Sequence, residues 1–416
     1  MTWLVLALSV SARPCVAAAS LPSPLTWRGL WAVVSAENPE LKAARAEADA
    51  ALSAAPSAAA PPNPTLMLST WEVPFAGSQV QGMADFQQTV PFPGKLIASS
   101  RAAAERSVAA RARALTSERR ISKESRATLA RYGLALRTLR VAALDAQTMQ
   151  DLLKTARTRF ATGGGDHPDL LRAEEEALNA DNDRLDADKE SRVARAKLNQ
   201  LMHRPAESEV PEPAEVAQVP VVWNLDDLRA RSAKNRPEVA GAEAQEREAR
   251  ALASAALWSY FPDLTLHAAY MPMLRGVGMD MWQAGVGLEL PLFGFARQHA
   301  ESSAAANRAS AASAESDAAR DRAAFETTKA YLDLQEALRH VALHRDRMIP
   351  LASRAVGSAE AAFAGGRIGF DALLDAARRL RQHHLEHQRW IARVETNLGE
   401  LEEAVGEELT AKEERK

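Results

Sequence analysis

The sequence has little cysteine, few aromatic residues and almost no net charge. One cysteine among 416 residues excludes an internal disulfide bond. Aromatic residues make up 5% of the chain although hydrophobic residues make up 47%, and alanine supplies much of that apolar content. This composition favours long helices that pack through small side chains. The 51 basic and 54 acidic residues are interspersed and leave a net charge of -3, so we do not expect nucleic acid as a partner.

Catalytic motifs are also missing. The chain has no Ser/His/Asp signature, no HExxH sequence and no phosphate-binding glycine loop. Gly163-Gly164-Gly165 follows a predicted helix and is not followed by Lys-Ser or Lys-Thr. We therefore expect that the protein is not an enzyme and has no cofactor.

Residues 1–19 have features of a secretory signal peptide. The apolar run Trp3 to Val10 is too short to span a bilayer, and Ala17-Ala18-Ala19 offers a cleavage site. Two features disagree, since no basic residue precedes the run and Arg13 follows it; a start further upstream would explain both. Cys15 is an alternative site of lipid attachment, although Ala-Arg-Pro before it is a poor recognition sequence. We expect no transmembrane helix elsewhere.

An internal repeat divides the chain into two similar halves. Asn38-Pro39-Glu40-Leu41 recurs as Arg236-Pro237-Glu238-Val239, and Pro64 recurs as Pro262 at the same offset. Because proline is tolerated at the first position of a helix, each four-residue sequence marks a helix start. We predict a first repeat over 28–202, a Pro/Glu-rich linker over 203–224, a second repeat over 225–406 and a charged tail over 407–416.

Each repeat is predicted to contain one pair of strands. Apolar residues alternate with polar or small ones over ~65–72 and ~84–90 in the first repeat, and over ~263–271 and ~281–290 in the second. Two interpretations stay open. The strands form a small sheet packed on a helix, or they contribute to the wall of a transmembrane β-barrel, which four strands are too few to close.

Long proline-poor segments follow the strands and predict two helical hairpins, over 95–202 and 296–406. Their tips share a pattern, in which Phe-Ala, glycines, an acidic residue and Leu-Leu span Phe160 to Leu171 and again Phe363 to Leu374. Pro350 is expected to kink or interrupt the second hairpin, whereas the first has Gln147 at that place. Side-by-side packing of the two hairpins predicts a flat slab of helices.

Acidic residues near the tips are candidates for a charged entrance. Asp371 and Asp375 are one helical turn apart and share a face, so a three-fold ring would place three carboxylates at each position. An alternative role for Asp371 is to cap the following helix and compensate its dipole. Asp166 and Asp169 occupy the first tip, where His167-Pro168 replaces Phe370-Asp371.

His383, His384 and His387 form a histidine cluster. His383 and His387 are four residues apart and can bind a soft metal together, and His340 and His344 repeat that spacing. The arginines around the cluster favour a solvated polar face instead. We therefore expect no metal site there.

The chain resembles the TolC-like outer-membrane efflux family over about residues 30–406. The resemblance is carried by Asn38-Pro39-Glu40-Leu41, Pro62-Asn63-Pro64, the segment Gln88 to Lys95, Glu289 to Gly294, Ile349-Pro350, Phe363 to Ala376, and Asn397-Leu398 with Leu401 and Gly406. It implies a mainly α fold with a small β part, built as a duplicated helix–β-hairpin–long helical hairpin. It further implies a trimer, with an outer-membrane β-barrel continued by a periplasmic α-helical barrel.

The resemblance also implies partners and sites. A homotrimer in outer-membrane lipid would work with a periplasmic adaptor (membrane fusion) protein and an inner-membrane efflux pump. Pro91-Phe92-Pro93-Gly94-Lys95 is similar to the branch that exports heavy metals and other cations. Of the two aspartates after the second tip, the resemblance favours Asp375 for the entrance ring. Adaptor docking is expected at the tips, at Gly163, Gly365, Gly366, Arg367, Leu373 and Leu374.

The leading prediction is the exit duct of a tripartite efflux system in the outer membrane of a Gram-negative bacterium. It would be a passive channel with its helices in the periplasm. One alternative is a periplasmic coiled-coil adaptor or structural protein without a barrel. The other is a metal-binding protein that uses His383, His384 and His387.

Overall fold

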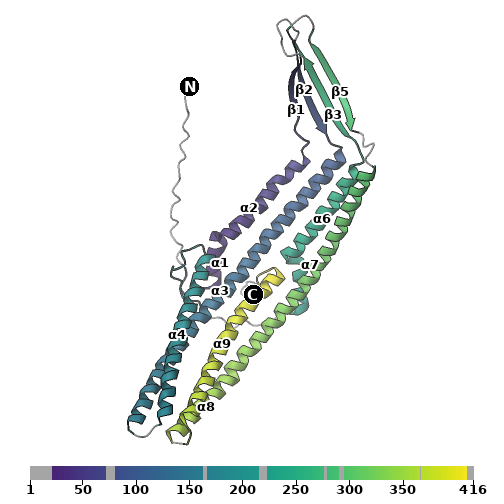
Figure 1. Cartoon of the computed structure of the whole chain (residues 1–416). Coiled ribbons are helices and arrows are strands. Elements are labelled where there is room, and N and C mark those ends of the chain that lie inside the picture. The colour runs from purple at the N-terminus through teal and green to yellow at the C-terminus, as the bar shows by residue number, and fades with distance from the viewer. Residues whose placement is uncertain are drawn as a thin grey trace, which may run out of the picture.

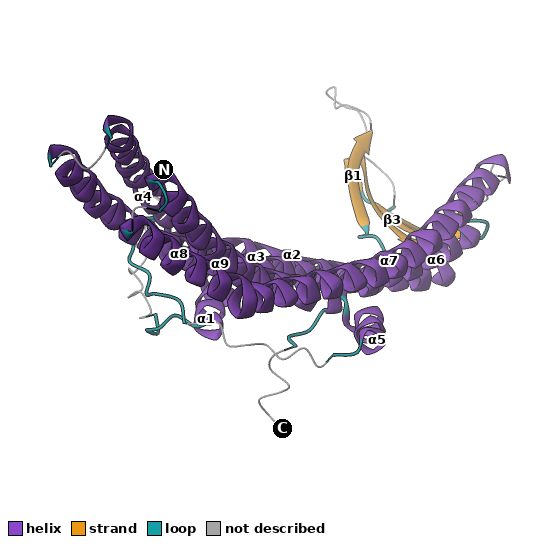
Figure 2. Cartoon of the chain, turned by 90° about the horizontal axis from the view of Figure 1, so that it is seen from below, coloured by secondary structure: helices purple, strands orange, loops and turns teal. Residues whose placement is uncertain are grey.

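The computed structural model describes residues 21–71, 80–162, 166–214, 223–275, 279–289, 295–365 and 367–409. These residues form a long layer of helices with a small antiparallel sheet at one end (Figure 1). The layer is curved, with α1 (Trp27–Glu37) and α5 (Leu225–Asn235) on its convex side (Figure 2). The expected flat slab is therefore wrong in shape, because long helices packed side by side cross at an angle and wrap around one another.

The two repeats have the same order of elements. The first runs α1, α2 (Pro39–Ala54), the 3₁₀ turn η1 (Ala55–Ala59), β1 (Thr65–Trp71), β2 (Val80–Val90), α3 (Pro93–Ala161) and α4 (His167–Leu201). The second runs α5, α6 (Pro237–Trp258), β3 (Asp263–Met271), β4 (Met273–Arg275), β5 (Met281–Glu289), α7 (Phe295–Leu343), the π-helical turn η2 (His344–Met348), α8 (Ile349–Ala364) and α9 (Phe370–Val405). The predicted mainly helical, duplicated fold is confirmed. The predicted signal peptide and Cys15 lie outside the described residues.

Local signals set where the helices begin. Asn38 caps α2, because its Oδ1 accepts from the backbone N–H of Glu40 at 3.0 Å and of Leu41 at 3.2 Å, while Pro39 lies at the first helical position. The Asn38 amide also donates to the carbonyl of Leu201 at the end of α4, 3.0 Å away. The cap therefore joins the start of one helix to the end of another within the first repeat.

The second long helix is interrupted where the sequence places Pro350. α3 runs unbroken for 69 residues, or roughly 100 Å, whereas α7 ends after 49 residues and the turn η2 follows. Proline has no backbone N–H, so it cannot donate the helical hydrogen bond to a carbonyl of the preceding turn. The backbone N–H of Ile349 bonds the carbonyl of His344, five residues back, so the chain continues through a π turn. The interruption is thus a single π turn, and the helix continues on both sides of it.

The sheet has the strand order β1-β2-β3-β5, all antiparallel, and β4 pairs with β2. The register places Leu66 opposite Phe86 and Leu266 opposite Val286. Since side chains alternate along a strand, one face is apolar across all four strands and the other is mainly polar. The apolar face contains Leu66, Leu68, Ala84, Phe86, Val90, Leu264, Leu266, Ala268, Tyr270, Trp282, Ala284, Val286 and Leu288.

An aromatic cluster joins the sheet to the helices. The Phe92 ring stacks on Trp258 at 5.4 Å and on Phe261 at 4.7 Å. Beside it, Asp263 accepts from the backbone N–H of Phe92 at 2.9 Å and pairs with Lys95 at 2.7 Å. The last turn of α6 and the first turn of α3 are therefore held together where the chain changes from helix to strand.

Apolar residues gather in three clusters along the helices. One joins α1, α3 and α4, a second joins α5, α7 and α9, and a third lies near the tips between α3, α4 and α9. The two halves also meet through a buried ion pair, in which Arg126 on α3 lies 3.5 Å from Glu402 on α9. Burial raises the pKa of the Glu402 carboxyl, and Arg126 offsets part of that effect.

Candidate functional sites

The sheet exposes its apolar face to solvent in the single chain. Trp282 is 78% exposed and Leu68 is 74% exposed. The side chains of Phe86, Val286 and Leu288 are exposed on the same face. Isolated exposed leucines are common, but a continuous apolar face over four strands marks a contact with lipid or with another protein. Among the described residues no helix packs on this face of the sheet, so the interpretation as a small sheet packed on a helix is wrong.

The edges of the sheet are also open. In the strand order, β1 and β5 are the outermost strands, and each has no partner on one side among the described residues. Unpaired strand edges are templates for pairing with another chain. Within the described part of the chain, no helix is both long enough and apolar enough to cross a membrane.

The helical layer has apolar residues along both of its edges. On α4, which forms one edge in Figure 1, the exposed residues Leu171, Leu178 and Leu185 repeat every seven positions. On α7, which forms the other edge, Phe325 and Leu332 are exposed with the same spacing. A seven-residue repeat on one face of a helix is the pattern that packs against a neighbouring helix. Each edge therefore presents a seam that lacks its partner helix within the chain.

The tips place only some of the predicted docking residues at the surface. Gly365 and Arg367 are exposed, whereas Gly163 and Gly366 lie outside the described residues. Leu373 and Leu374 are 8% and 5% exposed, so their side chains are buried in the single chain. Leu374 belongs to the cluster near the tips, where the second hairpin packs against the first.

Asp371 does not cap α9. The capping position is Gly369, and no side chain caps this end of the helix, while Asp371 lies in the first turn. Its carboxylate pairs with Arg172 on α4. Asp375 is exposed one turn later and lies 3.9 Å from Arg378. Both aspartates remain on the surface of the chain.

The two aspartates after the first tip have different positions at the start of α4. Asp166 occupies the capping position of α4 without a side-chain cap bond, and Asp169 lies in the first helical turn. The ring of His167 lies 5.4 Å from that of Phe160. Neither aspartate pairs with the second hairpin in the recorded ion pairs of the described residues, unlike Asp371.

Ion pairs join the two hairpins between α4 and α9. Arg172 pairs with Asp371 near the tips, and Arg378 pairs with Glu176 one turn further from them. Arg381 continues the series, since it pairs with Asp145 on α3 and lies 3.8 Å from Asp183 on α4. The pairs become less exposed with distance from the tip. No local sequence pattern indicates these pairs, because their members are separated by about 200 positions.

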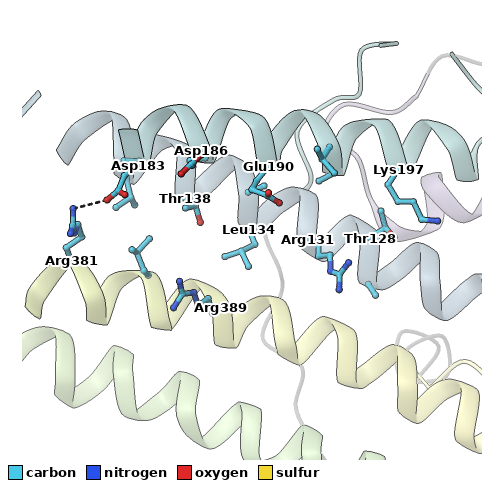
Figure 3. Close-up of a pocket in the computed structure, with 18 of the residues that line it drawn as sticks. Thr128, Arg131, Leu134, Thr138, Asp183, Asp186, Glu190, Lys197, Arg381 and Arg389 are labelled. Atoms are coloured by element: carbon cyan, nitrogen blue, oxygen red, sulfur yellow. Dashed lines mark ion pairs between the residues drawn. The ribbon is translucent and has the colours of Figure 1, made fainter. Parts of the chain in front are cut away.

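A groove of about 970 Å³ opens between α4 and α9, with α3 as its floor (Figure 3). The floor combines apolar residues such as Leu134 and Val141 with polar ones such as Thr138. Acidic residues predominate on one bank, beside Lys197 at its end, and arginines on the other. Asp183, Asp186 and Glu190 project from α4, and Arg381 and Arg389 project from α9. The groove is therefore shaped and charged to hold an amphipathic segment.

The histidines are closer together than the sequence indicated. His344 in η2 lies against α9, with its ring 5.7 Å from that of His383. The His340 ring stacks on Trp390 at 4.0 Å. Within the described residues, no group of three or more histidine, cysteine, aspartate or glutamate side chains is arranged to hold a metal ion. The pair His383 and His387 thus has no third ligand in place.

A sequence profile of outer membrane efflux proteins matches residues 32–203 and 228–407, which covers most of both repeats. The chain belongs to the outer membrane efflux protein family. None of the curated proteins matches the chain in sequence. The efflux protein is similar in fold to VceC, an outer membrane protein of Vibrio cholerae, with 20% identity over 92% of this chain and 96% of VceC and a TM-score of 0.79.

Two further structures share the fold of this efflux protein. CusC is 17% identical over 92% of each chain, with a TM-score of 0.79. The MtrE outer membrane channel of Neisseria gonorrhoeae, solved in its open state, is 17% identical over 92% of this chain and 89% of MtrE, with a TM-score of 0.75. The predicted TolC-like outer-membrane efflux family is confirmed.

Proposed function

We propose that three copies of this efflux protein form a channel through the outer membrane, which serves as the exit duct of a tripartite efflux system. One observation carries the proposal. The sheet has an exposed apolar face and two open strand edges. A single chain therefore leaves an apolar surface uncovered and strand hydrogen bonds unpaired. Lipid would cover the face, and neighbouring copies would pair the edges into a shared twelve-stranded barrel.

The helical edges support the same assembly. The edge that α4 forms in one copy, with Leu171, Leu178 and Leu185 exposed, would pack against the edge that α7 and α8 form in the next, where Phe325, Leu332 and Leu351 are exposed. Two different surfaces that meet head to tail close into a ring when the rotation between copies is right. The curvature of the layer (Figure 2) favours such closure and would place α1 and α5 outside the tunnel.

The two hairpins would form the gate. The ion pairs between α4 and α9 hold the hairpins together near the tips, so opening would separate them. Asp371 and Asp375 would each form a three-fold ring of carboxylates at the periplasmic entrance, which attracts cations. Asp166 and Asp169 would contribute acidic charge from the first tip.

The adaptor would dock at the tips and along the groove. Gly365 and Arg367 are exposed at the second tip, and we extend this proposed surface to Gly163 and Gly366 from the sequence pattern. A helix of the adaptor with an apolar stripe between a basic and an acidic flank would complement the groove. An inner-membrane pump would supply the energy, since nothing in the chain's motifs couples it to a chemical reaction.

Heavy-metal cations are the cargo we propose. The support is the resemblance of Pro91-Phe92-Pro93-Gly94-Lys95 to the cation-export branch, together with the acidic entrance. Deleting the gene should raise the toxicity of Zn²⁺, Co²⁺, Cd²⁺, Cu⁺ or Ag⁺. Increased toxicity of organic compounds alone would contradict the metal assignment and leave the channel proposal intact.

Assembly is tested by the mass of the detergent-extracted protein. Membrane fractionation followed by light scattering should give a trimer from the membrane fraction. Leu178→Glu combined with Leu185→Glu should convert the trimer to smaller species, because each change places a charge in the α4 seam. Leu144→Glu is the matched control, since Leu144 is exposed on α3, which lies between α4 and α9 and not at an edge.

The same fractionation separates the alternatives. A water-soluble mature chain that needs no detergent would support a periplasmic adaptor or structural protein and overturn the channel. Stoichiometric Zn²⁺ or Cu⁺ binding that requires His383 and His387 would support the metal-binding alternative.

A further inference from the structure

The two hairpins differ at one joint. In the first repeat α3 passes straight through the region of Gln147, while in the second the chain winds through η2 before α8 begins. π turns inside helices occur frequently at functional sites. η2 joins α7 to α8 and packs against α9, so it lies along the chain between the long helix of the second hairpin and its tip.

Five of the nine histidines of the chain gather around this joint. They are His340 on α7, His344 in η2, and His383, His384 and His387 on α9. His344 is 8% exposed, and its Nδ1 is buried without a hydrogen-bond partner among the described residues. The Nε2 atom of His387 is in the same situation. Unpaired buried polar atoms are rare in folded proteins and require an explanation.

Burial and nearby histidines favour the neutral form at this joint. Burial lowers the pKa of His344 first, and the charges of His383 and His340 lower it further, while Glu386 and a hydrogen bond with the His383 backbone act in the opposite direction. Burial likewise lowers the pKa of His387, as do His344, Arg345 and His384, with Asp346 opposing them. Among the nearby groups, Asp346 is paired with Arg345 at 2.8 Å, and His340 lies 3.8 Å from Glu336.

The direction of the pH effect follows from these shifts. An imidazole with a pKa lowered by folding stabilises the packed state while it is neutral, above its ordinary pKa of about 6.5. That stabilisation is lost as the pH falls from about 6.5 through the lowered value. The charged imidazole is stabilised by hydration when the joint opens and the ring is exposed to water.

We propose that His344 and His387 make η2 a proton-sensitive joint, at which acid loosens the packing of α8 against α9. A metal is not needed for this response, since no three-ligand group exists in the described part of the chain. A link between this loosening and opening of the gate depends on the proposed function. The loosening itself belongs to the second hairpin and does not require a channel.

Hydrogen exchange of the intact protein with EDTA present tests the proposal. Protection factors, corrected for the pH dependence of the chemical exchange rate, are compared at pH 7.5 and pH 5.5. Protection in 344–364 should fall by up to about tenfold for each histidine, because the binding of protons by an exposed imidazole changes by that factor between these pH values. The equivalent segment 141–161 of α3 contains no histidine and should not respond.

Variants assign the effect to individual side chains. His344→Gln and His387→Gln should each reduce the pH response of 344–364, and the double variant should remove it. His384→Gln is the matched control, because His384 is exposed on the same helix and the response should remain. If His344→Gln does not fold, His387→Gln alone still tests the assignment.

Three results would overturn the proposal. They are an equal loss of protection in 141–161, an undiminished response in the double variant, and a Zn²⁺-dependent gain of protection at pH 7.5 that needs His344, which would indicate a metal site. None of these readouts depends on efflux or conductance. A protein that failed as a trimeric channel would therefore still give a clear answer for the joint.

Discussion

The ion pairs between the hairpins predict a graded effect on opening. The outermost pair, Arg172 with Asp371, has side chains that are 51% and 63% exposed, and exposed pairs contribute about 0.2–1 kcal/mol. The innermost pair, Arg381 with Asp145, has side chains that are 32% and 15% exposed. A charge-assisted hydrogen bond in such a partly buried place contributes about 1.5–3 kcal/mol. Arg378 with Glu176 lies between these limits.

These energies convert to changes in the open fraction. If opening separates α9 from both helices of the first hairpin, α3 and α4, each lost pair shifts the closed–open equilibrium by its own contribution, and about 1.4 kcal/mol corresponds to a factor of ten. Arg172→Gln should therefore raise the open fraction about twofold. Arg378→Gln should raise it about fivefold, and Arg381→Gln by about tenfold or more.

Single-channel recording in planar bilayers measures the open fraction. Arg379→Gln is the matched control, because Arg379 is an exposed arginine on the same helix between the two paired ones. A double-mutant cycle of Arg381 with Asp145 should give a coupling energy close to the single-variant effect. Equal opening by Arg172→Gln and Arg381→Gln, or a cycle without coupling, would show that these pairs do not hold the hairpins closed.

Three further predictions concern stability and can be followed by thermal or denaturant unfolding in detergent. Arg126→Met should lower the free energy of unfolding by about 3–4 kcal/mol at pH 7, because Glu402 then stays buried without its cation. At pH 5 the loss should shrink to about 1 kcal/mol, since the carboxyl is protonated there at little cost. An unchanged loss at pH 5 would contradict this. Gly406→Ala should cost about 1–2 kcal/mol, since Gly406 has φ of 81°; an unaltered midpoint would show that the turn relaxes. Gly94→Ala should lower the midpoint and change the fluorescence of Trp258, because a Cβ there would lie 2.4 Å from the indole ring; wild-type fluorescence would mean that the ring moves freely.

Periodic patterns accounted for the elements. Alternation over 263–271 and 281–290 agrees with β3 and β5, and the absence of proline after Lys95 agrees with the length of α3. Pro350 predicted an interruption, and the structure has one. Each of these features depends on residues a few positions apart, so it can be predicted from the sequence.

Contacts between distant segments account for what the sequence did not predict. Leu373 and Leu374 follow a glycine turn and looked like surface residues, yet the packing of one hairpin on the other buries them. Asp371 had the residue type of a cap, but Gly369 takes the capping position and Arg172 on the other hairpin pairs with the carboxylate. The leucines of α4 did have a readable seven-residue spacing. Their exposure, however, depends on which helices lie beside α4.

The sequence by itself determined the repeat, the long helices, the amphipathic strands and, through resemblance, the family. Local propensity and periodicity are sufficient for these, because they act within one element. Only the tertiary structure decided which faces remain uncovered, how α4 and α9 are paired, and that five histidines meet at η2. Those properties arise when segments from different repeats come within a few ångströms, a distance that no local pattern in a single sequence specifies.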